Sequence, residues 1–72
     1  MAIGNEVGQL TSYYTKYGKA VACVVVARDA ENITVREGFD GDGKELTFPV
    51  TALRKLNPNA KVEVIDLWNT GR

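Results

Sequence analysis

The sequence contains no histidine and only one cysteine, Cys23. An internal disulfide is therefore excluded, and we expect no metal site, because structural zinc is held by several Cys and His ligands. The chain also carries no net charge, since nine Lys and Arg residues balance nine Asp and Glu residues. This balance weighs against partners that are bound through bulk charge, such as nucleic acids or membrane surfaces.

Long hydrophobic runs and targeting signals are missing as well. No apolar stretch reaches the length that is required to cross a bilayer. The N-terminal residues lack the basic and apolar regions of a secretory signal peptide. A single thiol within an apolar stretch fits a reducing compartment. We therefore expect an intracellular, cytoplasmic protein, or a virion component if the chain is derived from a phage.

The chain has 72 residues, which suffice for one domain, expected over residues 1–72, with a small core. In domains of this size, the free energy gained by burying apolar surface is nearly cancelled by the loss of conformational entropy. Disulfides, metals or oligomerisation commonly supply the difference. Because the first two are not expected, the composition favours self-association or packing into a larger assembly.

One stretch, Ala20–Ala27, is entirely apolar and contains four valines. β-Branched side chains favour extended backbone, so we predict a central strand over residues 20–28. Because the stretch lacks the alternation of a half-exposed strand, both of its faces are expected to be covered. The side chains that we expect to face the core are Val21, Cys23 and Val25.

Four shorter strands are predicted around this central strand, separated by turns that contain Gly, Asp or Asn. In the strand before Pro49, Leu46 and Phe48 are expected to face the core. In the last strand, Val62 and Val64 are expected to face it. Apolar residues spaced three apart also predict one helical turn. The predicted strands cover residues 7–15, 33–37, 45–48 and 61–67, and the helical turn covers residues 50–56, with Leu56 as its last apolar residue.

This order of elements predicts an all-β domain: a five-stranded small barrel with one short 3₁₀ or helical turn before the last strand. A barrel pairs its own edge strands and suits a chain of this length. The succession of four strands, one helical turn and a fifth strand resembles that of SH3-like barrels, over nearly the whole chain.

Residues 48–57 carry a more local resemblance. Their sequence, Phe-Pro-Val-Thr-Ala-Leu-Arg-Lys-Leu-Asn, is similar to the end of the plasmid-borne type II dihydrofolate reductases, which carry Tyr-Pro-Val-x-Ala-Leu, two variable residues and Ile-Asn. That family forms tetramers of SH3-like barrels, so the resemblance implies a barrel that assembles. Its working residues are a Gln-Ile-Tyr run before the proline, where this chain has Leu46, Thr47 and Phe48. The missing glutamine and tyrosine hydroxyl argue against reductase activity.

Three aromatic residues and two lysines lie close together around the first predicted turn. Such a segment resembles the aromatic groove with which SH3 domains bind polyproline peptides, and it also suits the stacking of exposed nucleobases with lysines on phosphates. The alternative is that one or two tyrosines cap the core and the others lie on ordinary surface. This candidate binding loop consists of Tyr13, Tyr14, Lys16, Tyr17 and Lys19.

Other charged or reactive residues have simpler explanations. A basic cluster around the helical turn suits contact with phosphates or an acidic partner, but it is also typical of solvated surface. Residues 40–45 begin like a calcium loop, yet Lys44 occupies a ligand position, so we interpret them as a turn. Cys23 lies in an apolar run, where a thiol is expected to be structural. The basic cluster consists of Arg54, Lys55 and Lys61.

The outward side of the central strand and the end of the chain form an apolar candidate interface. Exposed apolar surface of this kind marks contacts with other proteins, unless the N-terminal lead or the C-terminal tail folds back over it. The expected interface residues are Ala22, Val24, Val26, Ile65, Leu67 and Trp68.

We therefore predict a non-enzymatic small β-barrel without a cofactor: an interaction or structural subunit that binds copies of itself or another protein. Such a small subunit would suit an accessory protein of a phage or mobile element. A nucleic-acid-binding barrel of the Sm-like or ribosomal type is the second interpretation, and an oligomeric enzyme of the reductase kind is the third. Salt distinguishes the first two, because apolar assembly tolerates salt whereas nucleic-acid binding weakens steeply with it.

Overall fold

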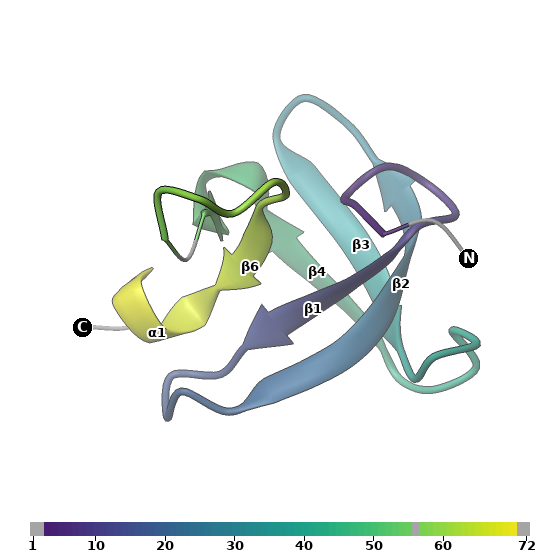
Figure 1. Cartoon of the computed structure of the whole chain (residues 1–72). Helices are drawn as coiled ribbons and strands as arrows, with labels where there is room; N and C mark the ends of the chain where they lie inside the picture. The colour runs from purple at the N-terminus through teal and green to yellow at the C-terminus, as the bar shows by residue number, and fades with distance from the viewer. Residues whose placement is uncertain (1–2, 56, 71–72) are drawn as a thin grey trace.

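The structure, a computed structural model, describes residues 3–55 and 57–70, with the backbone alone for residues 69 and 70. Its elements are the strands β1 (Leu10–Tyr14), β2 (Ala20–Arg28), β3 (Asn32–Glu37) and β4 (Glu45–Pro49), the 3₁₀ turn η1 (Val50–Ala52), the strands β5 (Leu53–Arg54) and β6 (Val64–Asp66), and the one-turn helix α1 (Leu67–Thr70). The all-β prediction is confirmed, and the predicted central strand has the bounds of β2 (Figure 1).

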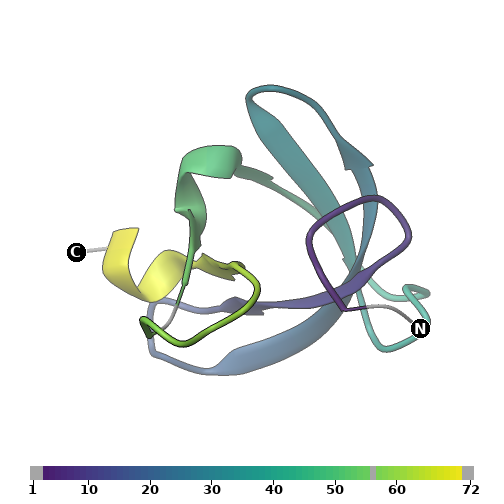
Figure 2. The ribbon, with the colours of Figure 1, turned by 45° about the horizontal axis from the view of Figure 1, so that its top comes forward.

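The strands form one mixed sheet in the order β4-β3-β2-β1-β6-β5, in which only β1 and β6 pair in parallel. The sheet curls around its core, and its edge strands β4 and β5 are joined through η1 (Figure 2). Among the described residues, no hydrogen-bonded ladder links these two edges. The predicted five-stranded closed barrel is therefore wrong, because a sixth, two-residue strand follows η1 and the sheet stays open.

The core lies inside the curl, and β2 and β3 contribute most of it. The inward residues predicted for β2 and for β4 lie in this core or pack against it. The alternation of β2 ends at Val26, where a bulge shifts the register with β3 and leaves Val26 38% exposed. The most deeply buried apolar side chains are Cys23, Val25, Ile33, Val35, Ala52 and Ile65, each at most 1% exposed.

The face of the last strand that packs on the core is not the predicted one: Ile65, rather than Val62 and Val64, points inward. Ile65 is fully buried and stands in register with Tyr13 of β1 and Leu53 of β5. Val62 and Val64 lie toward the surface instead, and the strand covers three residues rather than residues 61–67. The parallel pairing is the reason, because it decides which residue of β6 stands beside the inward-facing Tyr13.

The first strand begins later than predicted because the N-terminal lead folds back on the sheet. Gly8 has φ +87°, and the Gln9 N–H donates to the Glu6 carbonyl (3.0 Å), so the chain turns just before β1. Ile3 then forms an isolated parallel bridge with Leu10. The lead therefore becomes part of the outer surface of the sheet instead of extending a strand.

The predicted helical turn is also shorter than expected. Leu53 is extended, with φ −73° and ψ 125°, and it pairs with Ile65, so the 3₁₀ turn ends at Ala52. The spacing of Val50 and Leu53 follows from their packing against the core on either side of one short turn. Leu56 lies outside the described residues.

The loop between β3 and β4 folds over the outer face of β2. The Gly38 N–H donates to the Ala22 carbonyl (2.9 Å), and Gly41, at φ +66°, lies against Val24. Val24 is consequently only 7% exposed, although it points away from the core. At this position the central strand is covered on both faces, as its unbroken apolar sequence predicted.

A substitution at Gly41 tests how closely this loop is packed. A Cβ at Gly41 would stand 3.0 Å from the Val24 Cβ, and the positive φ is costly for any residue with a side chain. We expect Gly41→Ala to lower the free energy of unfolding, measured by urea denaturation, by about 2–3 kcal/mol.

Gly8→Ala is the matched control for this variant. Gly8 also has a positive φ, but among the described residues beyond its two chain neighbours no atom lies within 4 Å of the position of its Cβ. Only the conformational cost remains, so the expected loss is about 1 kcal/mol. Equal losses for the two variants would show that the loop does not press on Val24.

Candidate functional site

An open apolar hollow of about 230 Å³ lies on the outer face of the sheet. Successive residues of a strand point to opposite faces, so Ala22 and Val64 in this hollow alternate with Cys23 and Ile65 of the core, whereas β1 lines it with three consecutive residues. Strands contribute Leu10, Thr11, Ser12, Ala22 and Val64, and loops contribute Ile3, Phe39 and Val62. The hollow thus gathers the N-terminal lead, the β3–β4 loop and the segment before β6.

The three loop residues of the hollow are large, apolar and exposed. Phe39 is 71% exposed, Ile3 65% and Val62 36%. Phe39 stands in the loop that is anchored to β2 by the Gly38 N–H, so its ring is held beside the hollow. Because small soluble domains rarely expose contiguous apolar surface, this patch has the character of a contact site.

A second, polar hollow of about 280 Å³ adjoins the apolar one, since Ile3 and Val62 line both. It brings together two residues of the predicted basic cluster, Lys55 and Lys61. The third residue of that cluster, Arg54, is exposed on β5 but does not line this hollow. The polar side chains of the second hollow are Asn5, Gln9, Lys55, Lys61 and Glu63.

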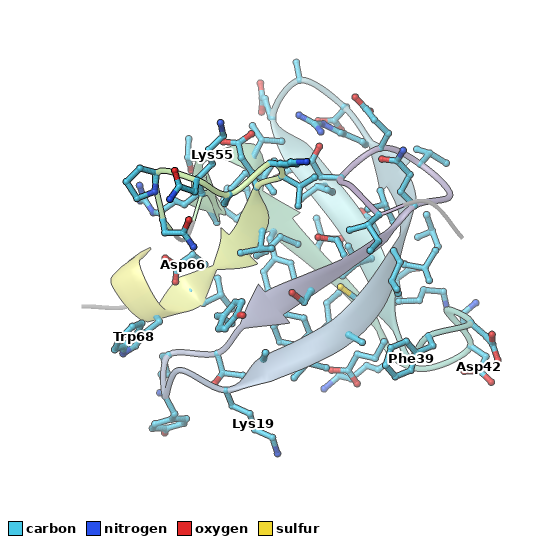
Figure 3. All side chains as sticks on the ribbon, in the orientation of Figure 1. Lys19, Phe39, Asp42, Lys55, Asp66 and Trp68 are labelled. Atoms are coloured by element: carbon cyan, nitrogen blue, oxygen red, sulfur yellow. The ribbon has the colours of Figure 1, made fainter. Side chains whose placement is uncertain are left out.

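An acidic loop borders the apolar hollow at Phe39. This residue is followed by Asp40 and Asp42, and both carboxylates are exposed. Phe39 and Asp42 lie on the opposite side of the molecule from Lys55 (Figure 3). The apolar surface therefore lies between a basic border and an acidic border.

The predicted interface is only partly presented at the surface. Val24 lies beneath Gly41 and Ile65 lies in the core, so neither side chain is accessible on this chain. The other residues of that prediction keep some exposure: Ala22 in the hollow, Val26 at the bulge, Leu67 against the core and Trp68 in α1.

Two prominent residues of this surface, Ile3 and Phe39, were missed by sequence reasoning. The available signal was Phe39, a large aromatic residue placed between Gly38 and the Asp-Gly turn that follows it. Turn segments of that kind are normally polar, so an aromatic residue within one indicates a surface contact. For Ile3 no comparable signal exists, because its place in the hollow depends on the turn of the lead.

The predicted binding loop is divided between the core and the surface. Tyr13 is 8% exposed, its ring packs against Phe48 with 5.3 Å between centroids, and its hydroxyl donates to the Glu37 carboxylate. Tyr14 is half-buried, whereas Tyr17 is 83% exposed. Tyr13 thus caps the core. The fully exposed part of the predicted loop consists of Lys16, Tyr17 and Lys19.

The β1–β2 turn fixes Tyr17 at the end of the hairpin. Thr15 Oγ1 accepts the backbone N–H groups of Tyr17 (3.3 Å) and Lys19 (3.2 Å), and Gly18 closes the turn at φ +82°. Trp68 of α1 lies next to this turn. A Cβ added at Gly18 would lie 3.8 Å from the indole ring. Trp68 is 46% exposed, so two accessible aromatic rings belong to this end of the molecule.

Tyr13, Cys23 and Glu37 form a cluster of titratable groups at the core. Burial, and then the hydrogen bond to the Glu37 carboxylate and its charge, raise the pKa of Tyr13 to about 12. Burial, and then the same charge, raise the pKa of the Cys23 thiol to about 11. Since the thiolate is the reactive form, Cys23 is a poor nucleophile at neutral pH.

The residues that match the working positions of the reductases have packing roles. Leu46 and Phe48 lie half-buried against the core. Thr47 faces outward, and its Oγ1 lies 3.0 Å from Thr34 Oγ1 across the β3–β4 pair. These contacts hold the edge strand in register.

Comparison of the chain with models of protein families, with curated protein sequences and with solved structures finds no match. Over residues 3–55 and 57–70, no three His, Cys, Asp or Glu side chains gather as ligands for a metal ion. In the same part of the chain, no helix has the length and apolar character needed to cross a membrane.

The buried cluster predicts a loss of stability at alkaline pH. Both groups have pKa values that are raised in the folded state, the thiol from 9.0 to about 11 and the phenol from 10.0 to about 12. Their protonated forms therefore stabilise the fold below pH 9, and this contribution is lost as the pH rises toward 12. We expect the urea midpoint to fall across this range.

Tyr13→Phe isolates the contribution of the phenol. At neutral pH it should cost about 1–2 kcal/mol, because the hydrogen bond to Glu37 is lost. Above the ordinary pKa of tyrosine, 10.0, its urea midpoint should fall less steeply than that of the unmodified chain. The same slope in both proteins would contradict a protonated Tyr13 in the fold.

Proposed function

We propose that this chain is a non-enzymatic β-sheet subunit that associates with a second copy of itself through the apolar hollow. The single observation that carries the proposal is Phe39, a 71%-exposed aromatic ring held at the rim of a hollow of about 230 Å³. A ring and a cavity on one surface allow a reciprocal contact between two copies.

The size of the hollow suits this contact. Apolar cavities of roughly 150 Å³ accept a benzene ring, so there is room for one phenylalanine side chain. In a two-fold dimer every contact occurs twice. If one residue of the first copy contacts a different residue of the second copy, the same pair also meets with the two copies exchanged. Phe39 of each copy would therefore enter the hollow of the other, on the side of Ile3 and Val62.

Charge complementarity favours a second copy as the occupant. The two-fold arrangement that seats Phe39 also brings the acidic border of each copy, Asp40 and Asp42, toward the basic border of the other, Lys55 and Lys61. The chain has no net charge to oppose association. A stable dimer needs about 800 Å² from each partner, which is a modest share of the 4674 Å² surface of this chain.

The chemistry of the described side chains supports a binding role rather than catalysis. The titratable groups that meet near the core are occupied with one another: Tyr13 donates to Glu37, and Cys23 stays protonated at neutral pH. The resemblance of residues 48–57 to the type II reductases supports a domain that assembles, and the packing of Leu46 and Phe48 supports a structural role for that segment.

Light scattering on a sizing column tests the proposal. We expect twice the mass of the chain at low and at high salt, because apolar contacts tolerate salt. Phe39→Ala should raise the dimer dissociation constant at least roughly 30-fold, the effect of losing a central aromatic anchor worth about 2 kcal/mol. Tyr17→Ala, which removes another exposed aromatic ring, is the matched control and should leave the mass unchanged.

Charge reversal tests the orientation of the two copies. Lys61→Glu and Asp42→Lys should each weaken the dimer at low salt, since each places like charges opposite each other. The variant that carries both changes should regain the lost affinity, and the differences should shrink at high salt. A double variant weaker than either single variant would reject this arrangement, and a monomer at every concentration would reject the proposal as a whole.

A further inference from the structure

A second surface, at the end of the β1–β2 hairpin, has a different chemistry from the apolar hollow. Tyr17 is 83% exposed and Trp68 is 46% exposed, and Gly18 of the turn lies next to the indole ring. The turn is held by hydrogen bonds to Thr15, so Tyr17 is presented on a rigid support. Accessible aromatic rings on a hydrogen-bonded turn are suited to stacking with flat ligands.

The exposed charges of this surface are all positive. Lys16 and Lys19 flank Tyr17, and the Lys16 ammonium lies 5.3 Å from the centre of the Tyr17 ring. Residues 15–20 and 67–70 contain no Asp or Glu. A neutral protein thus carries a small basic patch that is interleaved with aromatic rings, and Asp66, which directly precedes α1, is buried rather than exposed on this patch.

We propose that this surface, with Tyr17, Trp68, Lys16 and Lys19, binds single-stranded nucleic acid. Unpaired bases would stack on the two aromatic rings, and the lysines would contact the phosphates on either side of them. Both features are needed to specify this ligand, because a polyproline peptide uses aromatic rings but gains nothing from two exposed lysines. Duplex nucleic acid offers phosphates but keeps its bases stacked in the helix.

The proposed nucleic-acid surface is separate from the proposed dimer contact. Trp68 lies at one end of the molecule, and Phe39 and Asp42 lie at the other, with Lys19 at the edge between them (Figure 3). A dimer formed through the apolar hollow would therefore keep both hairpin ends accessible. Two sites on one particle would raise the affinity for a long strand by increasing its effective concentration at the second site.

The test uses the full chain and a short labelled oligothymidine at low salt. Trp68 is the only tryptophan, so stacking should quench the intrinsic fluorescence while the anisotropy of the label rises. Tyr17→Ala should weaken binding by about 5- to 150-fold, the range for loss of one stacked base, and Tyr17→Phe should keep most of the affinity. Since Tyr17 is exposed, neither change threatens the fold.

Lys16→Ala and Lys19→Ala test the phosphate contacts. Each should weaken binding and make the dependence of log affinity on log salt shallower by about 0.7, the contribution of one phosphate contact to a single strand. Phe39→Ala is the control, because it should impair self-association and leave the affinity for the short strand unchanged. Tyr17→Ala should leave self-association unchanged and weaken the binding of the short strand. Failure of one proposal is therefore distinguishable from failure of the other.

Three outcomes would overturn the nucleic-acid assignment. The first is an unchanged Trp68 fluorescence and label anisotropy at low salt. The second is a duplex that binds as tightly as the single strand, since stacking on the aromatic rings would then play no part. The third is quenching by a polyproline peptide without any response to the oligonucleotide, which would assign the surface to a peptide partner instead.

Discussion

The fold depends on the placement of β2, which is hydrogen-bonded to β1 on one side and β3 on the other. Its inward side chains, Cys23 and Val25, fill the core, and on its outer face Val24 is covered by Gly41. The uncharged segment 21–25 of this strand is buried or half-buried on both faces, which removes its apolar side chains from water. Both the core and the outer surface are therefore arranged around this strand.

The same strand links the core to the proposed contact surface. The loop that covers Val24 also carries Phe39. The position of the loop that buries Val24 therefore places the Phe39 ring at the surface. Loops tolerate such exposure better than strands do, because their side chains are not needed to hold the sheet together. On the outer face of the sheet, the loop thus covers Val24, whereas Ala22 nearby lines the open hollow.

The parts of the fold that could be predicted from the sequence are those determined by neighbours along the chain. The apolar stretch of β2 and the alternation of Ile33 and Val35 are local patterns, and β2 and β3 match them. The orientation of β6 is not local. Its segment offers apolar residues on both faces, Val62 and Val64 against Ile65 and Leu67, and only its pairing with β1 selects between them.

The candidate surfaces follow the same division. Tyr17 and its lysines could be identified from the sequence, because a turn keeps them together and at the surface. Tyr13, in the same cluster of residues, could not be separated from them until its contact with Phe48 was known. The apolar hollow was recognised only in part, because Ile3 and Phe39 are brought to it by two turns that are far apart along the chain.

The parallel pairing of Tyr13 with Ile65 also has a consequence for how the chain folds. The hairpins of β1 to β4 join neighbouring segments and can form as soon as those segments have been synthesised. β6 must instead close a loop that contains nearly all of the other elements, and its entropic cost makes this a late step. Until then the side of Tyr13 that faces Ile65 stays in water, so a nascent chain that stops before β6 presents an incomplete core to the chaperones and proteases of the cell.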